Sequence, residues 1–260
     1  MKTIFFGKVA LVEPTGNAIR YEEPITGRLI PDDPSDDLRH ADALASGLAA
    51  VWARENTCEA LFEAMERKEV YATTGTRWRV RVFAGWGFEE ADMDRSNFAA
   101  HGYENGVPMR GDLTDMPEGA APKLMIRALR DPDGANLDRV QVVKGWTNAD
   151  GTLQEQVYDV AWSGDRAAGS DGKLPPVGNS VDEATATYTN AIGAPTLGAF
   201  WEDPDFDPAQ RAFYYVRILE IPTPRWTTYD AVFFGFDLPE DAPVSHQETA
   251  YTTPIWYTPG

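Results

Sequence analysis

The chain has 260 residues, 43% hydrophobic and 25% charged, so it has enough apolar side chains to bury a core and is not a wholly disordered protein. Its 23 Lys and Arg residues against 41 Asp and Glu residues give a formal net charge of −18. This charge excludes a nucleic-acid binder, which neutralises phosphates with cationic side chains, and it disfavours anionic membrane surfaces. Cys58 is the only cysteine, so neither an internal disulfide nor a cysteine-based zinc site is possible.

The sequence contains no membrane-spanning or export signal that we recognise. No run of about 18 apolar residues is present, so we expect no transmembrane helix and no membrane insertion. Lys8 ends the short apolar stretch after Lys2 before the core of a signal peptide would be complete. We therefore expect a soluble protein that is cytoplasmic by default.

The first quarter of the chain is patterned as a small α/β segment. Residues 4–12 are predicted to form a strand, residues 31–37 a turn-rich acidic loop, and residues 48–53 either a helix or a buried strand. A helix is predicted to follow, with Asn56 as its N-cap and Glu59 completing a capping box. The apolar residues expected on its buried face are Cys58, Leu61, Phe62 and Met65.

After Gly75 the pattern changes to serial strands. Three arginines at positions 77, 79 and 81 alternate with apolar residues, which indicates a strand with one wet and one buried face. Other strand-like runs cover residues 70–74, 123–129, 140–146, 153–162, 184–189, 213–221 and 248–256. This density of strands predicts a mainly β fold, an antiparallel β-sandwich or barrel. The predicted domains are an α/β segment over residues 1–75 and a β-sandwich over residues 76–260.

The sequence contains no familiar catalytic motif that would assign a reaction to the chain. The histidines His40, His101 and His246 are far apart and none stands at a metal-ligand spacing, so we expect surface or loop roles for them. There is no Gly-x-Ser-x-Gly elbow and no glycine-rich phosphate loop. Cys58 lies on the predicted helix face, where a small core residue is expected rather than a nucleophile.

One acidic loop has the spacing of a calcium site. Asp131, Asp133, Asn136 and Asp138 place oxygen atoms around a glycine turn, as calcium loops do. The loop lacks the glutamate at the twelfth position of an EF-hand, and Asp-Pro-Asp-Gly is also a strong β-turn sequence. A plain turn and a calcium site both stay open, and the same holds for the acidic loop at residues 203–208.

Aromatic residues gather in the last third of the chain. Trp201, Trp226, Tyr229 and Trp256 are placed either to floor a shallow carbohydrate site or to pack in the core. Core packing is favoured, because large aromatics dominate β-sandwich cores. A small-molecule or carbohydrate ligand therefore stays open as a partner.

Several longer strings point to one family. They are GLAAVWARENT at residues 47–57, VYATTG at 70–75, DPDGANLDRVQVVKGW at 131–146, DPDFDPAQRAFYYVR at 203–217 and EIPTPRW at 220–226. The set runs through essentially the whole chain. It resembles the uncharacterised bacterial family known as domain of unknown function 3604, which is related to metallohydrolases of the polymerase-and-histidinol-phosphatase (PHP) type.

The resemblance implies a hydrolase lineage, with residues 1–75 similar to the end of a PHP-type barrel. Family members are longer, and their metal-binding histidines lie upstream in a Gly-Asp-x-His-x-His strand end. The resemblance therefore implies that this chain is their C-terminal part and lacks the metal site. Two residues depart from the family pattern: Cys58 stands where arginine is usual, and Arg110 puts a bulky cation where glycine is expected in a tight loop.

Three functional hypotheses follow. The first is an accessory or structural region of a PHP-like, metal-dependent hydrolase family of unknown substrate. The second is a stand-alone hydrolase of ester or glycosidic bonds that uses carboxylates, with Arg54 and Glu55 beside a helix N-terminus as catalytic candidates; an ordinary ion pair explains the same two residues. The third is a calcium-stabilised carbohydrate-binding module.

The first hypothesis also predicts an assembly. A barrel remnant would leave apolar residues of the N-terminal third without part of their partner surface, and such a patch tends to be covered by association. We therefore expect a homo-oligomer that forms through this third. The residues concerned are Leu48, Val51, Trp52, Leu61 and Met65.

Overall fold

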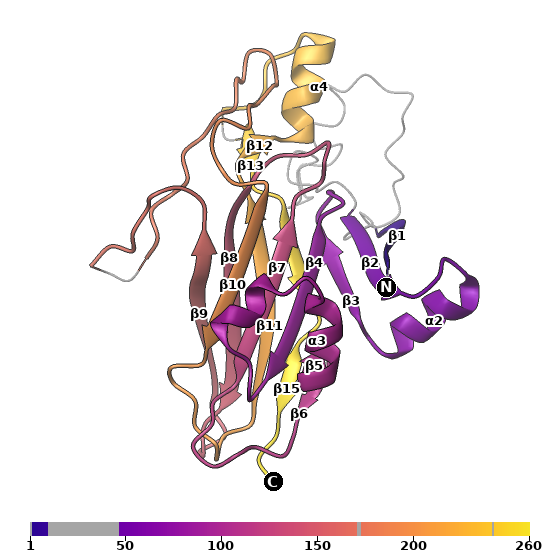
Figure 1. The fold of residues 1–260 in the computed structure, drawn as a ribbon. Coiled ribbons are helices and arrows are strands. Elements are labelled where there is room, and N and C mark those ends of the chain that lie inside the picture. Colours follow the sequence, from indigo (N-terminus) through magenta and orange to yellow (C-terminus); the bar gives the residue numbers. More distant parts are fainter. Residues whose placement is uncertain (1, 10–46, 171–172, 241) are drawn as a thin grey trace.

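Strands dominate the computed structural model, which describes residues 2–9, 47–170, 173–240 and 242–260 (Figure 1). The strands are β1 (Lys2–Val9), β2 (Gly47–Ala53), β3 (Val70–Thr73), β4 (Arg79–Gly85), β5 (Val107–Pro108), β6 (Asp112–Leu113), β7 (Lys123–Leu129), β8 (Leu137–Thr147), β9 (Leu153–Trp162), β10 (Thr196–Glu202), β11 (Ala212–Glu220), β12 (Thr223–Pro224), β13 (Ser245–His246), β14 (Thr249–Thr252) and β15 (Ile255–Tyr257). The helices are α2 (Cys58–Glu66), α3 (Phe98–Asn105) and α4 (Trp226–Phe234), with a short 3-10 helix, η2 (Glu90–Asp94).

The predicted mainly β, antiparallel fold is confirmed. One sheet has the strand order β1-β2-β3-β14-β11-β15-β6, and it also carries β8 beside β11 and β9 beside β8. A second sheet has the order β10-β7-β4-β5. Within the described residues both sheets stay open, so the sandwich alternative describes the fold and the barrel alternative does not.

The core lies between these two sheets. Along β11 every second residue is buried, from Ala212 to Glu220, which is the period-two pattern of a strand with one face in the core. Side chains from both sheets join the same apolar cluster, among them Val80, Val82, Leu124, Ile126, Val140, Tyr214, Val216 and Ile218. The α4 helix stands at one end of the sandwich beside β12 and β13, and α3 lies beside β4 and β5 (Figure 1).

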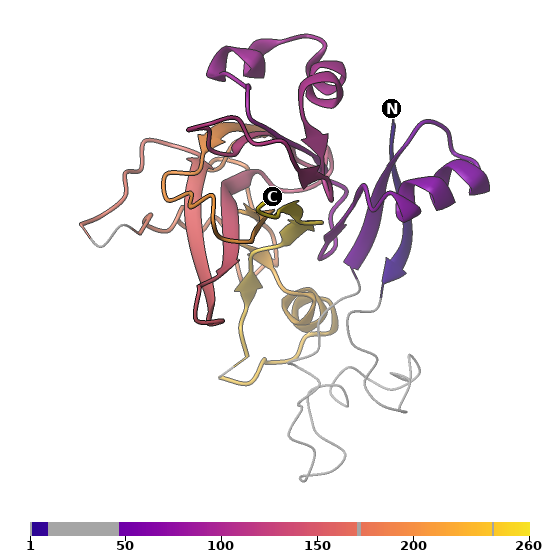
Figure 2. The same cartoon turned by 90° about the horizontal axis from the view of Figure 1, so that it is seen from below.

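The N-terminal elements lie together at one side of the molecule. In both views β1, β2 and α2 are on the side opposite β9 (Figures 1 and 2). The β3 strand pairs with β14, with Thr73 opposite Ala250, so the sheet continues across the predicted boundary at residue 75.

Two further predictions depend on which residues the structure describes. The predicted loop at residues 31–37 lies outside the described residues. No described helix is long and apolar enough to cross a membrane.

The predicted start of the helix is wrong by one residue. Residues 48–53 belong to β2, and α2 begins at Cys58 with Thr57 as its N-cap. The hydroxyl of Thr57 accepts a hydrogen bond from the amide of Ala60 at 3.3 Å. The predicted cap, Asn56, therefore lies outside the helix.

The predicted buried face of α2 is right only at Leu61, which is half-buried and packs against Val51, Ala53 and Ala64; it is wrong at the other three residues. The small residues Ala60 and Ala64 pack against β2, whereas Cys58 is exposed and Phe62 and Met65 are 60% and 42% exposed. Small side chains let the helix lie close to the sheet, and Phe62 and Met65 point outward. Cys58 is thus not a core residue.

Two predicted strands differ in the second half of the chain. Residues 184–189 form no strand, because Ala186 has a left-handed φ of 49° that breaks the extended backbone. Residues 248–256 form two strands, β14 and β15, which pair with different halves of β11. Pro254 lies between them and has no amide hydrogen for a sheet.

Candidate functional site

A cavity of about 1040 Å³, here called the seam cavity, lies where α2 and the turn before β3 approach α3 and β5. The chain leaves β2 at Ala53 and enters α2 at Cys58, so the short connection between them supplies part of the wall. Charged and polar side chains of both signs face the cavity. They include Arg54, Glu55, Glu63, Arg67, Glu69 and Tyr103.

Glu69 is positioned by the way α2 ends. The amides of Lys68 and Glu69 donate to the carbonyls of Met65 (2.9 Å) and Ala64 (3.1 Å), which is a Schellman cap. The carbonyl of Glu69 in turn accepts a hydrogen bond from the amide of Trp52 in β2 at 3.0 Å. The residue is held at both ends and is only 4% exposed.

A chain of polar contacts runs from Glu69 into the sandwich. The hydroxyl of Tyr103 donates to Glu69 Oε2 at 3.0 Å and accepts from Arg81 Nη1 at 3.0 Å. The Arg81 guanidinium lies 3.7 Å from the centre of the Trp52 ring. Burial raises the pKa of Tyr103 to about 12 and lowers the pKa of Arg81. At neutral pH the Tyr103 hydroxyl therefore keeps its proton and donates it in a hydrogen bond to Glu69.

A second cavity, the arginine groove, lies at the other end of this chain and has a volume of about 630 Å³. Arg79, Arg81 and Arg127 line it, and Arg81 stands directly opposite Arg127 on neighbouring strands. Like charges in this position destabilise a sheet. Here each of the two has an aromatic neighbour: Trp52 for Arg81 and, at 4.1 Å, Phe98 for Arg127. Arg81 was predicted to lie on the solvent-facing side of its strand. It is buried instead, because its guanidinium packs on the Trp52 ring.

The structure brings the two catalytic candidates into the seam cavity. Arg54 and Glu55 are both exposed and line it together with buried Glu69. Sequence patterns did not indicate Glu69 or Tyr103, because the two residues are 34 positions apart and lie on elements whose packing no local motif encodes. The sequence signals that pointed to this region were Arg54 and Glu55 beside a helix start and the alternation of arginines around β4.

The four calcium candidates lie in a loop rich in arginine partners. Arg77 binds Asp131 through its backbone amide (2.8 Å) and Nε (3.2 Å), and it binds Asp133 through Nη2 (2.7 Å). Burial alone would raise the pKa of Asp131, but the hydrogen bonds from Arg77 and the Asp133 amide hold it below its ordinary value. Asn136 donates its side-chain amide to the carbonyls of Asn190 and Ile192.

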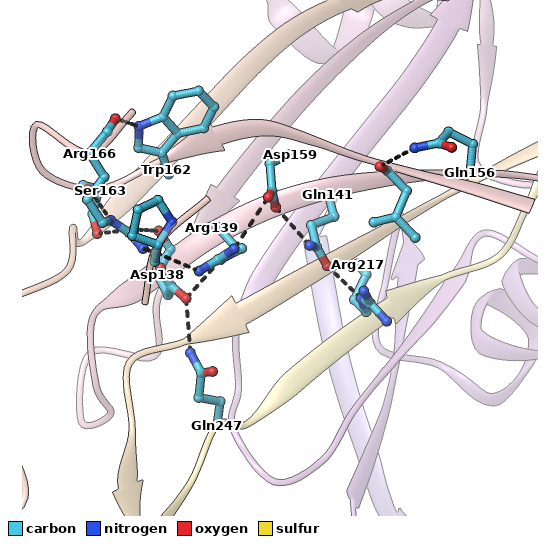
Figure 3. A network of polar contacts seen from close by, with 12 residues as sticks. Asp138, Arg139, Gln141, Gln156, Asp159, Trp162, Ser163, Arg166, Arg217 and Gln247 are labelled. Carbon is cyan, nitrogen blue, oxygen red and sulfur yellow. Dashed lines mark hydrogen bonds and ion pairs between the residues drawn. The ribbon is translucent and has the colours of Figure 1, made fainter. Parts of the chain in front are cut away.

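The fourth candidate, Asp138, is the centre of a buried polar network (Figure 3). It is 1% exposed and accepts hydrogen bonds from Arg139 (3.0 Å), Arg166 (2.6 Å) and Gln247 (3.0 Å). Arg139 also reaches Asp159 on β9 at 3.3 Å. The guanidinium groups of Arg139 and Arg166 and the amide of Gln247 thus already bind the Asp138 carboxylate that a calcium ion would need as a ligand. The calcium site stays a prediction.

The residues of the described part do not fit the metal centre that a PHP-type lineage implies. His101 lies 3.2 Å from Asp92, and His246 lies 2.9 Å from Glu248. Hydrogen bonds from backbone and Arg95 lower the pKa of Asp92 to about 2. His40 lies outside the described residues, and among those described no three His, Cys, Asp or Glu side chains gather as a metal would require.

Glu220 is a buried carboxyl that the sequence did not indicate. It is 1% exposed, and its Oε1 accepts a hydrogen bond from the amide of Ala135 at 2.9 Å. Its Oε2 has no hydrogen-bond partner among the described residues. Burial raises the pKa of Glu220 to about 8, against the opposing effect of the Ala135 amide. No cavity described above contains it, so it belongs to the core rather than to the site.

Comparison with models of protein families shows the family of this chain. A family model described as protein of unknown function (DUF3604) matches residues 2–259. No curated protein matches the chain, and no solved structure matches it.

Proposed function

The chain belongs to the DUF3604 family, whose description assigns no activity, and we propose that it works there as an accessory region rather than as a catalytic centre. In this proposal the family is related to PHP-type metallohydrolases. The chain contributes one wall of a ligand-binding space, the seam cavity, and a surface for assembly, the outward face of α2.

The observation that carries the proposal is the outward face of α2. Phe62 is 60% exposed and Met65 is 42% exposed, next to exposed Cys58. Apolar side chains that gather on one exposed helix face are typical of a surface that another protein covers. An accessory region acts through such a contact.

A second copy of the chain is the partner that we propose for this face. Among the described strands β1 pairs with β2 alone, so no described strand pairs with its other edge, and such an edge can pair with another chain. A two-fold pairing of two β1 edges would extend the sheet, and it would place both copies of α2 near the axis because α2 packs on β2.

Sedimentation velocity tests this assembly. We expect the wild-type chain to be a dimer at micromolar concentrations and the double variant Phe62→Glu/Met65→Glu to be a monomer with an unchanged melting temperature. Phe233→Glu on α4, where the side chain is 80% exposed, is the matched control and should stay a dimer. A wild-type monomer, or a dimer that survives the double substitution, would contradict the proposal.

A second candidate function is hydrolysis of an ester or glycosidic bond by carboxylates. It is favoured by the presence of Arg54, Glu55 and Glu69 around one cavity. If the purified chain cleaves such a substrate, Glu55→Ala should lower kcat by a factor of about 10² or more, as loss of a general acid or base does. Turnover that is unchanged by Glu55→Ala and by Glu69→Gln removes this candidate.

A further inference from the structure

A third cavity, of about 480 Å³, lies between the end of α2 and the strands β6 and β15. Three of its lining side chains are cationic: Lys68, Arg110 and Arg211. One is acidic, Asp112, and the indole of Trp256 adds an aromatic surface that is 39% exposed. Within the described residues no acidic side chain forms an ion pair with the three cations. A chain with a net charge of −18 thus has a locally positive cavity.

Arg110 reaches this cavity from an unfavourable backbone position. The amide of Gly111 donates to the carbonyl of Pro108 at 2.8 Å, and Arg110, the third residue of this turn, has a left-handed φ of 71°. A turn with this geometry favours glycine at that position. Arginine at this position therefore brings a cation to the cavity at a cost in backbone strain.

Lys68 reaches the same cavity in the same way. It occupies the residue after the C-cap of α2, with a φ of 55°, in the Schellman cap described above. Glycine is the usual residue at this position because it adopts left-handed φ without strain. Of the four non-glycine residues with left-handed φ in the described part of the chain, two are cations that line this one cavity.

Both turns are tied to the segment that carries the indole. The Thr253 hydroxyl donates to the carbonyl of Lys68 at 2.8 Å, and the amide of Trp256 donates to the carbonyl of Gly111 at 3.0 Å. The Trp256 ring packs against Phe213, with ring centres 5.2 Å apart. The backbone segments that carry the two cations and the indole are therefore held in fixed positions relative to one another.

We propose that this cavity binds an acidic saccharide. Arg110, Lys68 and Arg211 hold its carboxylate or sulfate ester, since guanidinium and ammonium groups form charge-assisted hydrogen bonds to such anions. The apolar face of the sugar ring lies on Trp256, and Asp112 accepts a hydrogen bond from a sugar hydroxyl. This site is separate from the seam cavity and stands independently of the accessory role.

Isothermal titration calorimetry of the full chain tests the proposal with three disaccharides: digalacturonate, a disaccharide with one sulfate ester, and neutral lactose. We expect at least one acidic disaccharide to bind, with an affinity at least tenfold above that of lactose, and to bind more weakly as salt increases. Binding of one acidic ligand but not the other identifies the anionic group. Equal affinity for lactose, or no binding of either acidic ligand, overturns the proposal.

Glycine variants separate recognition from folding. Arg110→Gly and Lys68→Gly remove a cation and also relieve left-handed strain, so we expect at least tenfold weaker binding with a melting temperature equal to or above that of the wild type. Asp115→Gly is the matched control, because Asp115 is exposed, has a φ of 52° and does not line the cavity. Unchanged affinity in both cation variants, or an equal loss in Asp115→Gly, overturns the proposal.

Discussion

Glu220 shows at the scale of one residue how burial changes the chemistry of a carboxyl. It ends the buried row of β11, where the preceding members of the row are apolar. The strand pattern of residues 213–221 predicted the row but not the protonation of its last member, because the environment is made by residues distant in sequence such as Ala135 and Trp78. A carboxyl with a pKa of about 8 is mostly neutral at pH 7.

This raised pKa predicts a pH-dependent stability. The raised pKa of Glu220 stabilises the folded protein, and this contribution is complete at pH values below the ordinary carboxyl pKa of about 4.5. It is lost as the pH rises from there through 8, and the total loss in the free energy of unfolding is on the order of several kcal/mol. Glu220→Gln stays neutral, so its free energy of unfolding should exceed that of the wild type increasingly between pH 5 and pH 9. Urea unfolding across this range measures the difference. Glu118→Gln, at an exposed position, should follow the wild type, and a constant difference for Glu220→Gln would contradict the explanation.

Arg77 gives a second prediction at the scale of the residue. Its guanidinium already binds Asp131 and Asp133, so a calcium ion at this loop would have to displace it. We expect the melting temperature of the wild type to be the same in calcium chloride and in EDTA. A calcium-dependent rise, which one-site linkage relates to the affinity of the ion, would instead support the calcium-stabilised module predicted from the sequence.

At the scale of the element, the cap of α2 distinguishes the observed helix from the predicted one. Thr57→Ala removes the hydroxyl that accepts from the Ala60 amide, so it should lower the free energy of unfolding by about 1 kcal/mol. Asn56→Ala, one residue outside the cap, should change it by less than about 0.5 kcal/mol. Urea denaturation of the pair decides the point, and the opposite order would restore Asn56 as the cap.

The elements also show which structural features local sequence can predict. The alternation of arginines at positions 77, 79 and 81 and the strand-like run at residues 213–221 are local signals, and the strands that they predict are present as β4 and β11. The face of α2 was misjudged because periodicity identifies an apolar stripe but not which side the sheet occupies. The small residues Ala60 and Ala64 determine which side of α2 faces the sheet, because they fit closely against β2. The φ of Ala186, likewise, is set by the loop around it and not by its own propensity.

At the scale of the whole molecule, the candidate site depends on contacts that no local motif encodes. Glu69, Tyr103 and Arg81 come from a helix end, α3 and β4, and they meet because Trp52 of β2 packs beside β4 and donates to the carbonyl of Val80 at 2.8 Å. The sequence placed Arg54 and Glu55 near a helix start, and this much of the site was predictable. The pairing of Arg81 with Arg127 follows only from the register of β4 against β7.

The most direct test of the accessory role is a hydrolysis assay of the purified 260-residue chain. The chain is incubated with manganese or zinc and with p-nitrophenyl esters, glycosides and phosphates, in parallel with EDTA. We predict no release of nitrophenol above that of a buffer containing the same metal. Metal-dependent turnover that EDTA abolishes would contradict the account and would show that the chain carries its own catalytic centre.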